Sequence, residues 1–213
     1  MATVSLPGAK PLRSRPWTWA LGFAVLVSAY VWAIKAPPFL MVGAESYEHA
    51  GLYAALMFAH VAGGTVPLFL GPLLLWSGLE RRIPTAHRWM GRSYLVIGAV
   101  GALAALWVSV IATHQPKSLY VATGTLAVFW LGAAAMAYRA IRHRRIEQHR
   151  EWMIRSYVLT LTFVGCRLAN HLPLFPELGA ERVTAQIWLF WVAPALATEY
   201  FLQWRRGAQA QAA

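Results

Sequence analysis

The sequence has no aspartate, a single cysteine and few charged residues for its length. Only 13% of the 213 residues are charged and 58% are hydrophobic, whereas a soluble domain carries roughly 25% charged residues. Segments of alternating polarity, which a membrane barrel needs, are missing as well. Lipid is therefore the expected solvent for most of the chain. An all-α integral membrane bundle follows, because helices pair their backbone polar groups internally.

Several motifs that carry known chemistry are also missing. The chain has no Cys-x-x-Cys-His for covalent haem, no glycine-rich phosphate loop and no His-Glu-x-x-His. No nucleophile motif of a serine hydrolase is present. The single Cys166 excludes an internal disulfide. These absences leave no motif that marks the chain as an enzyme.

The apolar residues form about six segments near the length that a membrane-spanning helix requires. Proline pairs and single prolines fall in most of the connections between them, where helices end. We expect one transmembrane domain, residues 17–206, between a cytoplasmic tail at 1–16 and a C-terminal tail at 207–213. The predicted spans are 17–34, 50–77, 91–113, 119–138, 152–171 and 183–204.

The basic residues predict how the bundle is oriented. Fifteen of the 19 lysines and arginines lie on the side of the membrane that holds both tails, in the tails and loops or at the adjoining ends of the spans. Short loops rich in lysine and arginine stay in the cytoplasm. We therefore expect both termini in the cytoplasm and the chain in the cell inner (plasma) membrane. The net charge of +11 then reflects topology and contact with the lipid bilayer, and no nucleic-acid partner is expected.

A stretch of sequence occurs twice. Residues 81–94 and 144–157 align without gaps at an offset of 63, and both contain Arg-Arg-Ile followed by Trp-Met-x-Arg-Ser-Tyr. Each copy joins an incoming span to an outgoing one, so the two hairpins have the same orientation. This is a parallel repeat about an axis along the membrane normal. It predicts a four-helix core of two hairpins, flanked by the first and last spans.

The duplicated motif has two interpretations. Trp89 and Trp152 fit the headgroup level, with Arg92 and Arg155 about one helical turn deeper. The arginines either snorkel to lipid phosphate or bind an anion, such as a haem propionate, a quinone carbonyl or a lipid headgroup. Glu199, near the cytoplasmic end of the last span, is a possible partner for one of them.

His60 lies deep in the second span, where an ionisable side chain suggests function. Small residues share its face of the helix, among them Gly63 and Gly71. Such a face suits a flat macrocycle, and it equally suits tight helix packing. Three roles remain open for His60: ligation of haem or metal, a structural hydrogen bond, or proton relay.

Haem held by two histidines needs imidazoles on facing helices. The outer candidates are His60 with His171 or His114, and the inner candidates are His87 with His149. His60 aligns with Thr123 in the repeat, so the duplication supplies no symmetric partner. A polar cluster inside the membrane is expected from Arg167, Asn170, His114 and Glu199. Arg167, Asn170 and His171 are spaced at i, i+3 and i+4, so they are expected to share one face of the fifth span.

The two motif copies, with His60 and Gly71-Pro72 upstream, resemble a bacterial family of predicted multi-pass membrane proteins called domain of unknown function 2306. The resemblance covers roughly residues 50–170, and that family carries no established activity. A looser similarity, to cytochrome b561-type and ferric-reductase-like proteins, implies a four-helix core with two haems. It is an analogy of fold, and the histidine spacing differs.

Our first hypothesis is a b-type haem protein that transfers electrons in the membrane, to and from quinone or another redox protein. His60, His87, His149 and His171 would be the ligands, with Arg92 and Arg155 holding propionates. The alternatives are a haem-free transporter of a small molecule, lipid or proton, and a structural or assembly subunit. The sequence indicates neither a substrate nor an oligomeric state.

Overall fold

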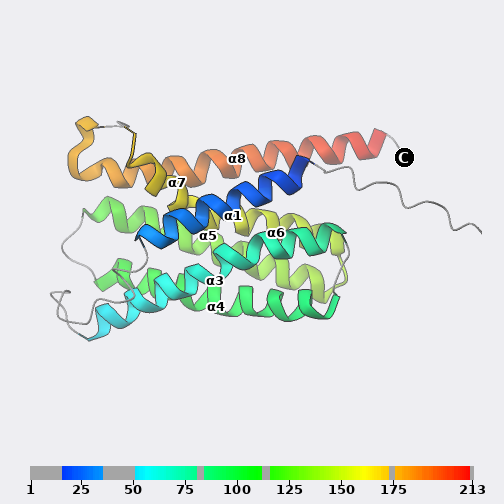
Figure 1. Cartoon of the computed structure of the whole chain (residues 1–213), viewed down its shortest axis with the longest axis horizontal. Coiled ribbons are helices and arrows are strands. Elements are labelled where there is room, and N and C mark those ends of the chain that lie inside the picture. Colours follow the sequence, from blue (N-terminus) through cyan, green and yellow to red (C-terminus); the bar gives the residue numbers. More distant parts are fainter. Residues whose placement is uncertain (1–15, 36–50, 81–83, 112–115, 173–175, 212–213) are drawn as a thin grey trace, which may run out of the picture.

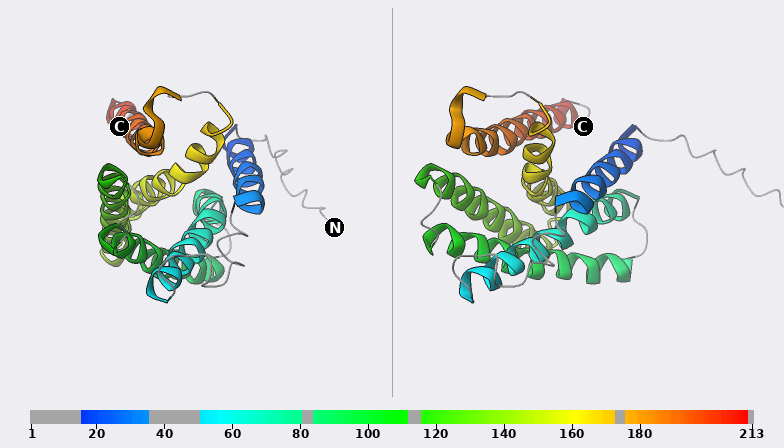
Figure 2. Two further views of the ribbon diagram at one scale, coloured as in Figure 1. Left: turned by 90° about the vertical axis from the view of Figure 1, so that its left-hand side faces the viewer. Right: turned by 60° about the vertical axis from the view of Figure 1, so that its left-hand side comes forward.

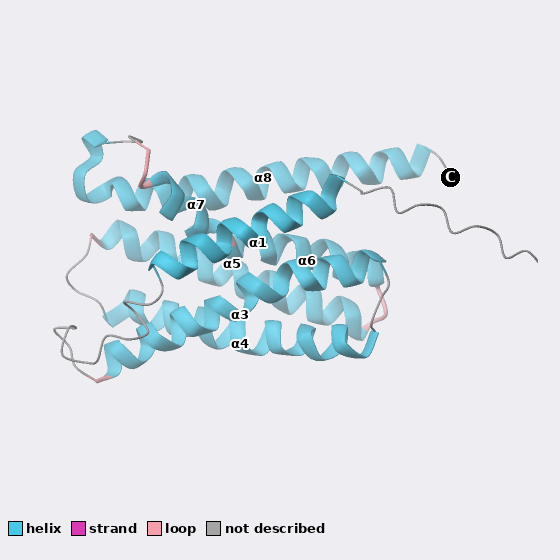
Figure 3. Cartoon of the chain, viewed as in Figure 1, coloured by secondary structure: helices cyan, strands magenta, loops and turns pink. Residues whose placement is uncertain are grey.

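The structure, a computed structural model, describes residues 16–35, 51–80, 84–111, 116–172 and 176–211. These residues form helices and turns and no strand (Figure 3). The helices are α1 (Pro16–Lys35), α3 (Leu52–Glu80), α4 (Pro84–Ile111), α5 (Lys117–Arg142), α6 (Ile146–Thr160), α7 (Thr162–Ala169), the short 3-10 helix η2 (Pro176–Glu181) and α8 (Arg182–Gln211).

Two helical hairpins make the core. α3 packs along α4 and α5 along α6, and contacts of α4 with α5 and of α3 with α6 join the hairpins into one four-helix group. α1 rests against α3 and α7, while α8 rests against α5, α6 and α7. Figure 2 shows α1 and α8 outside this group. The predicted all-α bundle with a four-helix core of two hairpins is therefore confirmed.

The direction of the helices matches a parallel repeat. The end of α3, the start of α4 and the turn between α5 and α6 lie at the same end of the bundle (Figure 1). The start of α1 and the end of α8 lie toward that end too. Both motif copies are therefore at one end, which we call the motif end. That the motif end faces the cytoplasm stays a prediction.

Among the helices that the structure describes, three are long and apolar enough to cross a membrane: Leu52–Gly78, Thr85–Ile111 and Lys117–Arg142. In α1 the apolar part, Thr18–Ile34, is shorter. The other two predicted spans correspond to α8 and to the interrupted pair α6–α7, and their crossing stays a prediction. Large apolar side chains remain exposed on the outside of the bundle, as lipid contact requires.

The helices extend beyond the predicted spans at the motif end. α4 begins at Pro84 rather than at residue 91, and α6 begins at Ile146 rather than at 152. The Trp-Met-x-Arg-Ser-Tyr copies thus begin in the second turns of α4 and α6 and lie inside the helices. Apolarity marks only the part of a helix in lipid, so the polar first turns were missed.

The predicted fifth span, 152–171, is not one helix. It is divided at Leu161 into α6 and α7, and α7 ends at Ala169. On either side of the break, threonine hydroxyls bond to backbone carbonyls: Thr160 to Ser156 and Thr162 to Leu159. Such bonds compete with the helical pattern and bend helices. Residues on both sides of the break line the cavity described in the next section: Thr160, Phe163 and Arg167.

Candidate functional site

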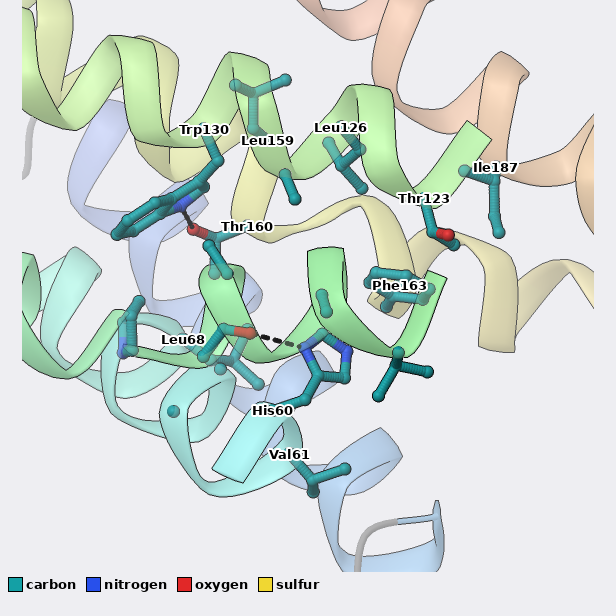
Figure 4. A pocket seen from close by; sticks show the side chains of 18 of the residues that line it. His60, Val61, Leu68, Thr123, Leu126, Trp130, Leu159, Thr160, Phe163 and Ile187 are labelled. Atoms are coloured by element: carbon teal, nitrogen blue, oxygen red, sulfur yellow. Dashed lines mark hydrogen bonds between the residues drawn. The ribbon is translucent and has the colours of Figure 1, made fainter. Parts of the chain in front are cut away.

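A cavity of about 420 Å³ lies between the two hairpins. Residues of α1, α3, α4, α5, α6, α7 and α8 line it, and most of them are apolar. Figure 4 shows His60 on one side, facing Thr160, Leu126 and Phe163 from the second hairpin and α7. A volume of this size and an apolar lining with a few polar groups are typical of small-ligand sites.

His60 reaches this cavity from the crossing of α3 and α4. The two helices touch backbone to backbone at Gly63 and Gly101, where a Cβ on Gly63 would lie 2.5 Å from the Gly101 Cα. This close approach brings His60 Nδ1 to 3.1 Å from the Gly101 carbonyl oxygen (Figure 4). The carbonyl only accepts, so Nδ1–H donates, and the acceptor lone pair of the neutral ring lies on Nε2.

The small residues beside His60 serve helix packing. Gly63 touches Gly101, and a side chain at Gly71 would collide with the ring of Tyr157. Gly64, by contrast, faces open space. Of the two interpretations of this face, tight packing is supported at Gly63 and Gly71.

Arg167 is the second ionisable anchor of the cavity. Its side chain lines the cavity from α7 and is partly buried. Within the described ranges, Arg167 forms no ion pair with a carboxylate. A guanidinium carries a positive charge and only donors, so this side chain is chemically suited to an anion or a hydrogen-bond acceptor.

Several hydroxyl groups of the cavity are hydrogen-bonded within the chain, to indole N–H groups or to one another. Thr65 accepts a hydrogen bond from Trp32 Nε1 at 2.9 Å, and Trp130 Nε1 donates to Thr160 at 2.9 Å. Ser109 and Thr123 lie 3.1 Å apart. Thr123, the repeat equivalent of His60, therefore faces the same cavity as a paired hydroxyl. His60 and Arg167 are the two groups left for a charged or polar ligand.

The remaining outer candidates are not brought to this cavity. Asn170 caps the end of α7, and both Asn170 and His171 are exposed and absent from the cavity lining. The expected shared face of Arg167, Asn170 and His171 is lost because the helix ends at Ala169. His114 lies outside the described residues. No second imidazole from the described part of the chain lines the cavity beside His60.

The inner candidates lie near each other at the motif end. His87 on α4 and His149 on α6 are close enough to repel electrostatically when protonated. His87 Nδ1 is 2.8 Å from Ser77 Oγ, which itself donates to Leu74, and His149 Nδ1 is 2.9 Å from the Ala137 carbonyl. His149 Nδ1 is therefore a donor, whereas the donor in the His87–Ser77 hydrogen bond depends on the tautomer of His87. Among the described residues, no group of three or more metal-ligating side chains is found.

Glu199 pairs with a motif arginine, as anticipated. Its carboxylate receives Arg155 Nε and, at 2.9 Å, Arg155 Nη2. Glu151 lies 3.8 Å from Arg155 Nη1 and accepts two hydrogen bonds from Arg206. Those bonds hold the pKa of Glu151 below its ordinary value, against the opposing effect of burial. Two carboxylates thus occupy Arg155, which argues against its predicted role with a propionate.

The two tyrosines at the end of the motif copies, Tyr94 and Tyr157, are buried between the hairpins and were not predicted as part of a site. Tyr94 is fully buried. Its hydroxyl oxygen lies 3.0 Å from Ser156 Oγ, and its ring stacks on the ring of Trp130. Tyr157 packs on Gly71 of α3. Each tyrosine thus reaches the opposite hairpin. The sequence feature that could have revealed this contact is the equivalent position of the two tyrosines in the repeat, which places both where the hairpins meet.

A comparison with known families places the chain. Residues 57–202 match the family described as "Predicted membrane protein (DUF2306)". The match includes most of α8, beyond the range that the two motif copies suggested. The chain matches no curated protein and no solved structure, so the similarity to cytochrome b561-type proteins stays an expectation. Since the matched region covers more than half of the chain, the protein belongs to the DUF2306 family of predicted membrane proteins.

Proposed function

We propose that the cavity between the hairpins binds a flat, largely apolar redox cofactor, and that this cofactor is b-type haem. The observation that carries the proposal is His60, an imidazole in an apolar cavity whose Nδ1 is held by the Gly101 carbonyl. Histidines that ligate metals typically donate their other ring N–H to such an acceptor, which fixes the tautomer and the ring orientation.

The two polar anchors of the cavity select the chemistry of the ligand. The neutral His60 ring offers a lone pair on Nε2, so it suits a metal ion or a hydrogen-bond donor. Arg167 offers only donors and a positive charge, so it suits an anion or an acceptor. A ligand that meets both must present a metal ion or a hydrogen-bond donor to His60 and an anion or an acceptor to Arg167, with an apolar body between them. Haem b meets this demand through its iron and its propionates.

In this proposal His60 is the protein ligand to iron, and Arg167 pairs with a propionate. The described lining supplies one imidazole, so a single protein ligand is proposed rather than a histidine pair. Bound haem would supply one-electron chemistry at iron, and the ligating residue and the apolar surroundings would tune it. The surrounding apolar side chains keep water from the cofactor, and exchange of electrons with quinone or another membrane redox protein is the proposed use.

The direct test is an absorption spectrum of the purified protein, oxidised and then reduced with dithionite, from cells supplied with haem. We expect a Soret band that shifts on reduction. His60→Ala should lose the bound haem, whereas Thr123→Ala should keep it, because Thr123 lines the same cavity at the equivalent repeat position. A featureless spectrum of a folded protein, or equal haem content in the two variants, contradicts the proposal.

A second candidate is a haem-free protein that binds or moves a quinol-class molecule. The same two anchors favour it, because a quinol hydroxyl donates to His60 Nε2 while its other oxygen accepts from Arg167. An oxidised quinone has acceptors only and fits the neutral ring less well. Organic extraction of a colourless protein should then release a lipophilic ring molecule from the native chain and from Thr123→Ala, but not from His60→Ala.

A further inference from the structure

The two copies of the motif share an arginine–tryptophan stack. The Arg92 guanidinium lies 5.0 Å from the Trp89 ring centre, and that of Arg155 lies 4.6 Å from the Trp152 ring centre. A cation over the face of an indole ring is held electrostatically, and the guanidinium keeps its N–H groups free at its edge. Each copy therefore presents an arginine prepared to bind an anion.

In the second copy the structure contains the anion, which is the carboxylate of Glu199. Arg155 binds the Glu199 carboxylate with two nitrogens, and Glu151 stands beside it. The first copy lacks both acids. The residue equivalent to Glu151 is Arg88, so a negative neighbour is replaced by a second positive one. α8 packs on the second hairpin, and it brings Glu199 to that copy alone.

Arg92 is therefore an arginine without its anion. Arg88 and Arg92 are both exposed, and they lie at i and i+4, on the same side of α4. Trp89 beside them is 64% exposed. Among the described side chains, neither arginine forms an ion pair. Two neighbouring guanidiniums with no carboxylate repel each other, and an external anion relieves this repulsion.

An apolar stripe runs along α4 from this arginine pair. Its large side chains recur at intervals of three and four residues, so they occupy one face of the helix, and all are at least half exposed. They are Val96, Val100, Leu103, Trp107 and Val110. An anion at Arg88 and Arg92 that carries an apolar chain finds a matching apolar surface about 21 Å long, roughly half of α4.

We propose that Arg88, Trp89 and Arg92 form a binding site for an anionic phospholipid. The two guanidiniums bind the phosphate, the indole lies at the level of the headgroup and glycerol, and an acyl chain follows the stripe to Val110. Tryptophan at the interface and arginine near anionic headgroups are each favourable in membranes. This site lies outside the cavity and does not depend on the proposed cofactor.

The stripe favours a lipid over the other sources of an anion. Free phosphate gains nothing from an apolar surface below the arginines. An acidic segment of another protein could bind the arginines, but it would leave the apolar stripe unused. The arginine pair followed by the stripe matches a phospholipid, in which a charged headgroup is followed by an apolar acyl chain. The lipid is therefore the occupant that uses all the observed features.

Native mass spectrometry of the detergent-purified chain tests the site. Phosphatidylglycerol and phosphatidylcholine are added to the native chain, to R88Q/R92Q and to R139Q/R142Q. The last variant removes the same charge from exposed arginines near the end of α5. We expect the native chain and R139Q/R142Q to hold phosphatidylglycerol in preference to phosphatidylcholine. R88Q/R92Q should lose that preference, by about fivefold for each arginine.

A phosphatidylglycerol with a photoreactive acyl chain supplies a second readout. In the native chain the crosslinks should fall on the peptide that carries Val96 to Val110, and they should disappear in R88Q/R92Q. Equal loss in both charge variants would show a general surface effect and overturn the site. Displacement of the lipid by inorganic phosphate, or a co-purified protein lost only in R88Q/R92Q, would also overturn it in favour of those occupants.

Discussion

The two hairpins start from the same motif and end in different environments. In the second hairpin Arg155 is mostly buried, is bound by Glu199 of α8 and lies near Glu151. In the first, Arg92 is exposed and keeps only its stack on Trp89. The difference comes from the flanking helices, since α8 packs on α5 and α6 whereas α1 packs on α3 and α7.

The same asymmetry shapes the cavity. The first hairpin crosses at Gly63 and Gly101, and the equivalent positions in the second are Leu126 and Val164. The glycine crossing holds α3 close to α4 and fixes His60, while Leu126 and Val164 line the cavity from the second hairpin and α7. The first copy thus carries both the glycine crossing and an exposed arginine, whereas the second copy carries a mostly buried arginine that is paired with Glu199.

The sharpest test of this contrast removes each motif arginine in turn. Arg155→Gln leaves Glu199 without its partner in a partly buried setting. We expect a loss of about 3 kcal/mol in the free energy of unfolding, the low end for one partner of a buried pair, because Glu199 keeps some exposure. Arg92→Gln should change the free energy of unfolding by less than about 1 kcal/mol. Thermal unfolding in detergent measures both.

The double variant Arg155→Gln with Glu199→Gln is the control for that test. If the pair acts as observed, it should be more stable than Arg155→Gln alone, because no unpaired carboxylate remains. Equal effects of the Arg92 and Arg155 substitutions would mean that the two copies have the same environment, against the structure.

The second test addresses the glycine crossing. Gly63→Ala places a Cβ against the backbone of Gly101, so α3 must move away from α4. We expect a cost of about 2 kcal/mol in the free energy of unfolding, as for overpacked cores, together with loss of ligand binding because His60 is no longer held. Gly64→Ala is the matched control, since its Cβ meets open space. Similar melting temperatures for the two variants would contradict a tight crossing.

The sequence predicted the hairpins well because their signals are local. Apolar runs, basic loops and the offset of 63 located the four-helix core and the common end of the motif copies. The pairing of Glu199 with an arginine followed from charge and depth. Which arginine it selects depends on the packing of α8, and no local pattern encodes that.

The site was predicted less completely. His60 was identified from its position deep within the second span. Its hydrogen-bond partner is a backbone carbonyl on another helix, and backbone groups cannot be located from a pattern of side chains. The face expected for Arg167, Asn170 and His171 failed because the helix ends at Ala169. The break at Leu161, before α7, is likewise accompanied by threonine hydrogen bonds to the backbone, which periodicity does not reveal. Haem binding itself stays a prediction.

The smallest expected effect is the response of the motif end to acid. The pKa of Glu151 is lowered by its hydrogen bonds from Arg206 and by the charges of Arg155 and Arg205. A carboxyl with a lowered pKa stabilises the fold above its unfolded pKa, and that contribution is lost as the pH falls through the folded value. Arg206 is half exposed, so the contribution should be below about 1 kcal/mol. We expect the melting temperature in detergent to fall slightly more on acidification in the native chain than in Glu151→Gln.

Arg88→Gln, at the equivalent position of the first hairpin, should follow the native curve because no carboxylate is lost there. A native chain and Glu151→Gln with the same acid response would show that α8 is not held by this pair.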